Sequence, residues 1–334
     1  MHLVVPYAAA ASEAGVSVLH GLRLPHLERL LARLAPTLKT ATDADSLNLP
    51  HEHLLAECRG WPIRDGQLPL AAWSAQGDGL PIAAADQGWG LLTPSHWQVG
   101  SEQILLLDPA QLHLDEDESR ALLQALRPLF EPEGWTLHWG APLRWYVTHA
   151  SLRELSTASL DRVVGRAIDP WLPDRRTGRT LRRLQSEAQM LLYTHPINAA
   201  REARGELAVN SFWLSGTGPT PSPAAGDREP SVDETLRGPW RAGDWAAWVE
   251  AWHALDAQRL ADLDLRAARG EPLALTLCGE RVAQRYDSVR RGAWQRLTQP
   301  WRRVDSLRVL QPLCARRAAP ERSRWSASGA KVAL

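Results

Sequence analysis

The chain has 334 residues, of which 44% are hydrophobic and 23% charged, an ordinary composition for a soluble globular protein. Lys plus Arg and Asp plus Glu both number 38, so no overall field favours nucleic acid or an anionic membrane as a partner. No apolar run reaches the roughly 18 residues of a membrane span, and the N-terminus does not resemble a signal peptide. The three cysteines are isolated, which predicts reduced thiols in a cytoplasmic protein.

The first part of the chain predicts one strand and two helices. Residues 2–5 form an apolar run ended by Pro6, which indicates a short buried strand. In residues 25–34, leucines at helical spacing follow a proline suited to the first helical position. Residues 51–59 predict a second short helix. The scattered Gly and Pro of residues 62–81 predict connecting segments.

The middle of the chain has the pattern of an α+β unit. Residues 104–107 predict a strand closed by an Asp-Pro pair. The acidic start of residues 115–130 predicts a helix, because carboxylates stabilise the N-terminal end of a helix dipole. Residues 135–139 alternate as a strand does, and residues 143–147 predict the next strand. A strand, a helix and two strands indicate an inserted α+β domain.

The last part of the chain begins with an amphipathic helix, predicted over residues 180–193. Residues 209–214 predict a strand that runs into a Ser-Gly-Thr-Gly turn at 215–218, which either cradles a phosphate or only reverses the chain. A long helix is predicted over 245–265, with Trp245, Trp248 and Trp252 as a core stripe, and a buried strand over 273–277.

Two segments have the composition of irregular chain. Residues 219–239 are rich in Pro, Gly and charge, which predicts a flexible loop or linker. Residues 313–334 are basic and poor in large apolar residues, which predicts a disordered tail.

The most specific pattern runs from 195 to 218, as His195-Pro196-Ile197-Asn198, Arg201 and then Val209-Asn210-Ser211-Phe212-Trp213-Leu214-Ser215-Gly216-Thr217-Gly218. It resembles a signature of the archaeal-type cofactor-independent phosphoglycerate mutases, and weaker likenesses follow in the same order over 1–290. The resemblance implies an α/β fold with an alkaline-phosphatase-like, mostly parallel sheet. Residues 1–90 and 156–312 would form that core, and residues 91–155 the inserted α+β domain.

A narrower resemblance rests on four runs: HWQVG at 96–100, GAPLRW at 140–145, ASLDRVVGR at 158–166, and the stretch 189–216. These runs are similar to the bacterial family of regulatory proteins named RpfE, for regulation of pathogenicity factors. That family is often labelled phosphoglycerate mutase by similarity. The resemblance implies a regulatory role, as a degenerate relative of the mutases, with no demonstrated reaction.

The mutases need two divalent metals and a serine nucleophile, and the matching positions of this chain hold other residues. Pro6-Tyr7 follows the first strand where the family has Asp-Gly, and Pro50-His51-Glu52 replaces the serine segment. The last strand ends in Cys278-Gly279-Glu280 in place of Asp-His, and 219–244 contains no Asp-x-x-x-His pair. Because hard cations need oxygen ligands, the resemblance implies that metal binding and phosphoryl transfer are lost.

The candidate ligand-binding residues are His195, Asn198, Arg201, Asn210, Arg144, His96 and Asp161. Equivalent polar residues in the mutases lie beside the phosphosugar acid, and arginine binds carboxylate or phosphate bidentately. The alternative is structural. Asn198 and Asn210 then cap helices or turns, and His195 satisfies a buried carbonyl. In the same way, Arg144 stacks on a tryptophan and Asp161 forms a local salt bridge or N-cap.

The sequence therefore predicts a non-catalytic regulatory or binding protein without a cofactor, whose partner is a small anionic metabolite or a protein. The first alternative is a 2,3-bisphosphoglycerate-independent phosphoglycerate mutase, which would interconvert 3-phosphoglycerate and 2-phosphoglycerate with divalent metals. The second is a metal-free enzyme that uses His51 or His195 as an acid–base group.

Overall fold

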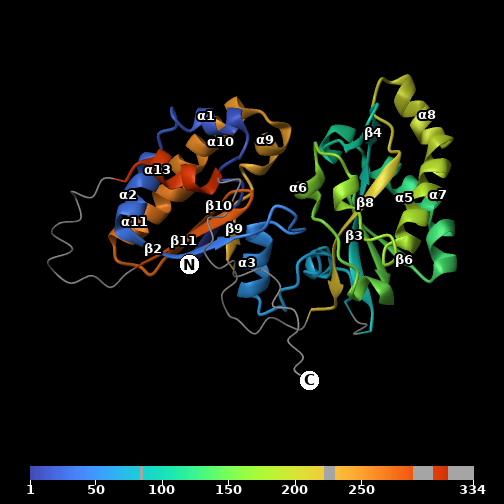
Figure 1. Ribbon diagram of the computed structural model, residues 1–334, viewed down its shortest axis with the longest axis horizontal. Coiled ribbons are helices and arrows are strands. Elements are labelled where there is room, and N and C mark those ends of the chain that lie inside the picture. The colour runs from blue at the N-terminus through green and yellow to red at the C-terminus, as the bar shows by residue number, and fades with distance from the viewer. Residues whose placement is uncertain (83–85, 222–229, 289–303, 315–334) are drawn as a thin grey trace. The chain divides into compact units, whose positions relative to one another are not determined.

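The computed structural model describes residues 1–82, 86–221, 230–288 and 304–314 (Figure 1). The chain divides into two compact units. Unit 1 comprises residues 1–45, 49–60 and 225–334, and unit 2 comprises residues 46–48 and 61–224. None of the helices in the described residues is long and apolar enough to span a bilayer.

Unit 1 is built on a five-stranded sheet in the order β2-β11-β10-β1-β9. Its strands are β1 (His2–Val5), β2 (Leu34–Ala41), β9 (Ser231–Val232), β10 (Ala274–Cys278) and β11 (Val282–Ser288). β1 runs parallel to β10 and β9, whereas β11 runs antiparallel to both β10 and β2. The α/β class is confirmed, but this sheet is mixed, where a mostly parallel one was expected. Only residues 279–281 join β10 to β11, and so short a connection joins antiparallel strands.

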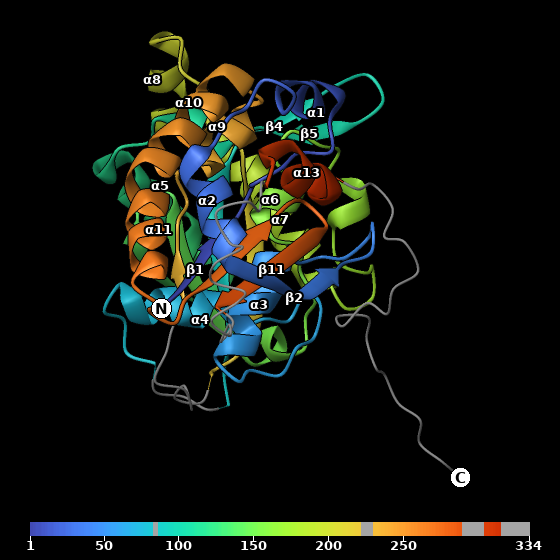
Figure 2. The same ribbon diagram turned by 90° about the vertical axis from the view of Figure 1, so that its left-hand side faces the viewer.

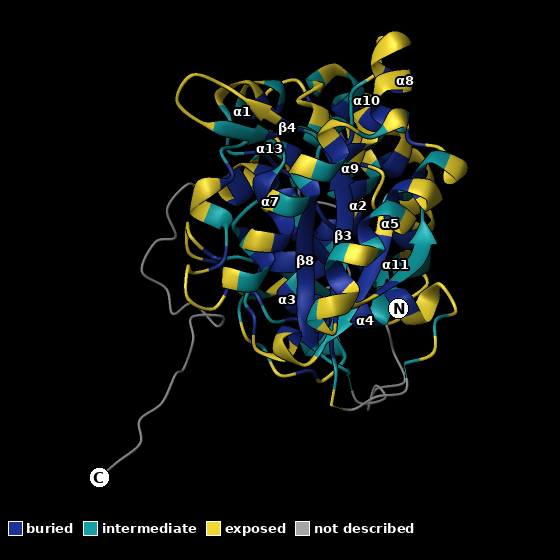
Figure 3. Ribbon diagram, turned by 90° about the vertical axis from the view of Figure 1, so that its right-hand side faces the viewer, coloured by how far each residue is buried: buried dark blue, intermediate teal, exposed yellow. Residues whose placement is uncertain are grey.

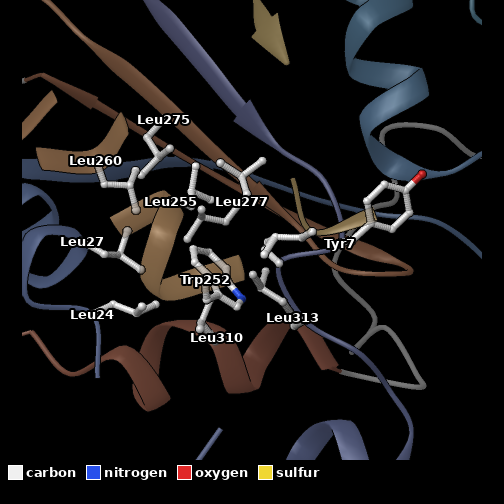
Figure 4. Packing of buried hydrophobic residues seen from close by; sticks show 14 of the residues in the cluster. Tyr7, Leu24, Leu27, Trp252, Leu255, Leu260, Leu275, Leu277, Leu310 and Leu313 are labelled. Atoms are coloured by element: carbon white, nitrogen blue, oxygen red, sulfur yellow. The ribbon is translucent and has the colours of Figure 1, made fainter. Parts of the chain in front are cut away.

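The helices of unit 1 are α1 (Glu13–Val18), α2 (Pro25–Arg33), α3 (Pro50–Cys58), α9 (Arg237–Ala242), α10 (Trp245–Leu255), a π-helical segment η5 (Asp256–Leu260), α11 (Ala261–Ala268), α13 (Ser306–Leu310) and a 3-10 turn η7 (Gln311–Cys314). In Figure 2, α2 and α11 lie in front of the sheet. The predicted long helix is present as α10, η5 and α11, with Trp248 and Trp252 fully buried as predicted. Figure 4 shows Trp252 among leucines of α2, α13 and β10.

Unit 2 contains a four-stranded antiparallel sheet in the order β6-β7-β3-β8 and a two-stranded one, β4-β5. The strands are β3 (Gly88–Ser95), β4 (Trp97–Val99), β5 (Ile104–Leu106), β6 (Thr136–Ala141), β7 (Arg144–His149) and β8 (Ser211–Pro219). The helices are α4 (Leu70–Gly77), α5 (Glu116–Phe130), α6 (Leu160–Val163), α7 (Arg179–Tyr193) and α8 (Pro196–Ala203), with 3-10 turns η1 (Pro109–Leu112), η2 (Glu131–Glu133), η3 (Ala150–Arg153) and η4 (Asp169–Trp171).

The larger sheet of unit 2 is packed on both faces. Leucines of α5 and α7 form one core with Leu92 and Phe212, while alanines of α4 pack on Trp89 and Tyr146. Figure 3 shows β3 and β8 as buried strands and much of α8 as exposed. Residues 46–48 belong to unit 2 because the Asp65 carboxylate accepts hydrogen bonds from all three of them, at 2.7 to 3.0 Å.

Several sequence expectations differ from this unit. Helix α4 lies in the region expected to be connecting segments. The Ser-Gly-Thr-Gly segment is not a turn, because β8 continues through it beside β3. Gly216, at φ 62°, provides the left-handed residue of a bulge there, which lets the strand go on after an extra residue.

The expected inserted domain, residues 91–155, lies inside unit 2, which extends from 61 to 224 apart from residues 46–48. The expected inserted domain and unit 2 have different bounds because β8, which was expected to belong to the core, pairs with β3. In the expected loop 219–239, residues 230–239 include β9 and the start of α9, and residues 222–229 lie outside the described part of the chain. Residues 315–334 of the expected tail also lie outside the described part of the chain.

Candidate functional site

The carboxyl ends of β1 and β10 are the first candidate site, because open α/β sheets bind ligands beyond the carboxyl ends of their parallel strands. Tyr7, two residues after β1, has a left-handed backbone at φ 58°, which is uncommon for a residue other than glycine. Trp248 Nε1 donates to the Tyr7 carbonyl at 3.0 Å, and the Ala8 N–H donates to the Cys278 carbonyl at 2.8 Å. These bonds hold the strained residue in place.

The Tyr7 ring is enclosed by aromatic neighbours. Its centroid lies 5.3 Å from that of His51, which contacts it edge-on, and 5.0 Å from that of Trp240. Figure 4 shows its hydroxyl pointing away from the packed leucines. The end of β1 is therefore an aromatic packing unit.

The end of β10 is covered by the segment of α13 and η7. The Leu313 carbonyl lies so close to Gly279 that any Cβ there would clash with it. The Ala10 N–H hydrogen-bonds Cys314, and burial raises the pKa of the Cys314 thiol to about 11. The Ala11 N–H donates to Glu280 Oε1 at 3.3 Å. In the described residues, no group of three or more His, Cys, Asp or Glu side chains could hold a metal ion. The residues at these strand ends therefore do not fit the pair of divalent metals that a mutase needs.

The predicted ligand-binding residues lie in unit 2, and three of them belong to α8 or its cap. His195 is the N-cap, and its Nδ1 accepts from the Ile197 N–H at 3.3 Å. Asn198 is 2% exposed and donates from Nδ2 to the carbonyls of Leu192 and Val209, both at 2.8 Å. Its Oδ1 accepts from the Val209 N–H at 2.9 Å. The Asn198 amide therefore fastens α8 to the chain on both sides of it.

Arg201 is fully buried in the same helix. Its Nε donates to the Leu207 carbonyl at 2.9 Å, and its two terminal nitrogens donate to Glu118 and to the Leu112 carbonyl. Arg204 pairs with the same Glu118 at 2.6 Å. An anion at Arg201 would have to compete with the Glu118 carboxylate.

His96 and Asn210 join the chain around β4 to the chain that enters β8. His96 Nδ1 donates to the Ala208 carbonyl at 2.8 Å. Asn210 Oδ1 accepts from the Trp97 N–H at 2.7 Å, and its Nδ2 donates to the Trp97 carbonyl at 3.0 Å. The structure therefore brings four of the predicted residues, His96, Asn198, Arg201 and Asn210, to the segment 207–210, where each makes a bond that supports the fold, whereas the side chain of His195 bonds within its own helix.

Arg144 and Asp161 lie in other elements. Arg144, in β7, forms a two-point ion pair with Asp78, at 3.0 and 2.9 Å, and the Tyr146 hydroxyl donates to the same carboxylate at 2.7 Å. Burial alone would raise the pKa of Asp78, but the hydrogen bonds from Arg144 and Tyr146 outweigh it and lower that pKa. Burial also raises the pKa of Tyr146 to about 12. Asp161 is buried in the first turn of α6, whose N-cap is Ser159.

Sequence reasoning did not identify Asp78 or Glu118, which form the ion pairs with Arg144 and Arg201. They lie 66 and 83 positions from these arginines, and no local pattern links residues so far apart. The ligand-binding role of the seven predicted residues stays a prediction.

No protein-family model and no curated protein matches this chain. Among solved structures, the chain is similar to a cofactor-independent phosphoglycerate mutase from Thermoplasma acidophilum, at 13% identity and a TM-score of 0.38, over 94% of this chain and 99% of that one. It is also similar to the PH0037 protein from Pyrococcus horikoshii, at 11% identity and a TM-score of 0.45, over 95% of this chain and 98% of that one.

Proposed function

We propose that this chain is a non-catalytic regulatory or binding protein on a mutase-like scaffold, as the sequence resemblance to the RpfE family implies. The observation that carries the proposal is the packing at the carboxyl ends of β1 and β10. Tyr7 is enclosed by His51 and Trp240, and Gly279 lies directly beneath the Leu313 carbonyl.

That packing supports a loss of phosphoryl transfer. Such a reaction needs a nucleophile and cation-binding oxygens that face the substrate. Here Ala8, Ala9 and Ala10 follow Tyr7 and are at most 1% exposed. Small buried side chains at these positions supply neither a nucleophile nor a metal ligand.

The ion pairs of Arg201 and Arg144, the two arginines predicted to bind a ligand, indicate which class of ligand is disfavoured there. Arg201 pairs with Glu118 and Arg144 pairs with Asp78, so each guanidinium already has a carboxylate partner. Displacing such a partner would cost an incoming anion part of its binding free energy. This arrangement disfavours a small anionic metabolite at these two arginines, which leaves a protein partner that binds elsewhere on the surface as the favoured class.

A coupled assay of the full chain with 3-phosphoglycerate and added Mn²⁺ tests the loss of catalysis. We expect no 2-phosphoglycerate above the enzyme-free background. Turnover that a chelator abolishes would overturn the proposal and establish the mutase alternative.

A thermal-shift titration with 3-phosphoglycerate separates the two classes of ligand, because a ligand that binds only the folded state raises the Tm. We expect no shift. A saturable rise that Arg144→Gln removes would instead establish a small anion as the ligand.

A further inference from the structure

Three buried serine hydroxyls of unit 2 have no hydrogen-bond partner. Ser95, Ser159 and Ser211 are 0%, 5% and 1% exposed. Their Oγ atoms are the buried hydroxyls without a partner in the described part of the chain, and the indole Nε1 of Trp97 is also buried without one. Burying a polar group without a partner costs free energy, so each such group needs a physical explanation.

Two of these hydroxyls belong to residues that lie side by side at one end of the larger sheet. Ser95 and Ser211 are paired across β3 and β8, on the face opposite Leu92 and Leu214, whose side chains point to α5 and α7. Trp213 extends from the same face as Ser211.

Trp213 contacts the segments that bear the other two groups, Ser159 and Trp97. Its Nε1 donates to the Ala158 carbonyl at 2.9 Å, which brings Ser159 to it, and its ring centroid lies 6.3 Å from that of Trp97. Both tryptophans and Ala158 belong to one small apolar cluster. The residues that bear the four unpartnered groups thus lie around a single tryptophan pair.

We propose that these groups form a binding site for a small uncharged molecule that bears hydroxyl groups, either water or a small polyol. A serine hydroxyl both donates and accepts, whereas the Trp97 indole only donates, so the ligand must offer donors and acceptors together. The four groups are uncharged donors and acceptors, which suit an uncharged ligand better than an ion that would have to be desolvated. The nearby Arg162 donates to the Asn48 carbonyl at 3.0 Å. The site is independent of the proposed function, which rests on strand ends of unit 1.

Replacing the hydroxyls tests the site through the sign of the change in Tm. If a bound molecule satisfies them, Ser95→Ala and Ser211→Ala should each lower the Tm by about 2 °C or more. The matched control is Ser119→Ala, whose hydroxyl is equally buried but donates to the Pro142 carbonyl and accepts from Trp145 Nε1. It should lower the Tm in any case. An unchanged or raised Tm in both Ser95→Ala and Ser211→Ala would overturn the proposal, because deleting a hydroxyl without a partner removes its desolvation cost.

Two further measurements identify the molecule. Millimolar xylitol should raise the Tm of the dialysed full chain, and not that of the Ser95→Ala/Ser211→Ala double variant, if the site takes a polyol. If xylitol has no effect, a crystal structure grown without polyols should show ordered water within hydrogen-bond distance of both hydroxyls. A structure with no such density would overturn the proposal.

Discussion

The Asn198 side chain pairs with the Val209 backbone as one strand pairs with another. Its Nδ2 donates to the Val209 carbonyl at 2.8 Å, and its Oδ1 accepts from the Val209 N–H at 2.9 Å. A third bond, from Nδ2 to the Leu192 carbonyl, reaches the last turn of α7. One buried amide therefore joins α7, α8 and the chain that leads into β8.

We predict that Asn198→Asp lowers the free energy of unfolding by about 3 kcal/mol, because two carbonyls lose their donor and face a carboxylate. Urea denaturation of the full chain measures the loss. Asn210→Asp is the matched comparison and should cost less, since the Asn210 amide forms two bonds where that of Asn198 forms three, and it is only half-buried. An Asn198→Asp protein that kept its stability and lost only ligand affinity would contradict the structural role.

Substitutions of the two arginines that share Glu118 should differ in how far they lower the free energy of unfolding. The Arg201 side chain is 0% exposed and that of Arg204 is 48% exposed. Removing one partner of a buried ion pair typically costs about 3–5 kcal/mol, so Arg201→Ala should show a loss of that order in chemical denaturation. Arg204→Ala should lose much less, because solvent screens an exposed pair. Equal losses in the two variants would argue against a buried structural pair.

The elements that the sequence predicts well are those with a local pattern. The bounds of α2, α5 and α7 were predicted to within one residue, since leucine spacing and an acidic start are visible in a single window. β2 and β3 were missed. β2 begins directly after α2 and contains Pro36, and β3 contains Gly90 and Pro94. Pairing with distant strands stabilises both, and no window of sequence displays that.

The candidate site shows the same limit. The pattern over 195–218 identifies a segment in which polar residues are closely engaged, and the structure shows that their partners are mostly backbone groups from the same region. The residues that face the two arginines, Asp78 and Glu118, come from other elements. The sequence motif thus predicts where the polar residues lie in the chain. Which of their donors and acceptors are already engaged is determined by tertiary contacts.

The pH dependence of stability should include a contribution from His2. Burial lowers the pKa of His2 to about 4, helped by Arg285 and the N-terminal ammonium and opposed by Asp287. Its Nε2 lies 2.9 Å from Thr276 Oγ1, so the neutral ring shares a hydrogen bond. The folded chain then binds fewer protons than the unfolded chain between about pH 4 and pH 6.5, and stability falls as the pH is lowered through that window.

We expect this contribution to be roughly 1–2 kcal/mol after solvent screening of a partly exposed ring. The free energy of unfolding, measured across the window, should depend less on pH in His2→Gln than in the unmodified chain. His20→Gln, at an exposed position, is the matched control and should leave the profile unchanged. Parallel profiles for His2→Gln and the unmodified chain would contradict the prediction.

The segment of α13 and η7 should depend on the absence of a side chain at Gly279. Because a Cβ there would meet the Leu313 carbonyl, Gly279→Ala must push this segment off the end of β10, at a cost of about 1–3 kcal/mol. Hydrogen exchange at the Ala10 N–H should also become faster, since Cys314 is its acceptor. Gly238→Ala is the control in unit 1, because that glycine has nothing within 4 Å of its Cβ position. Gly279→Ala with native stability and unchanged exchange would show that the close approach does not hold the segment.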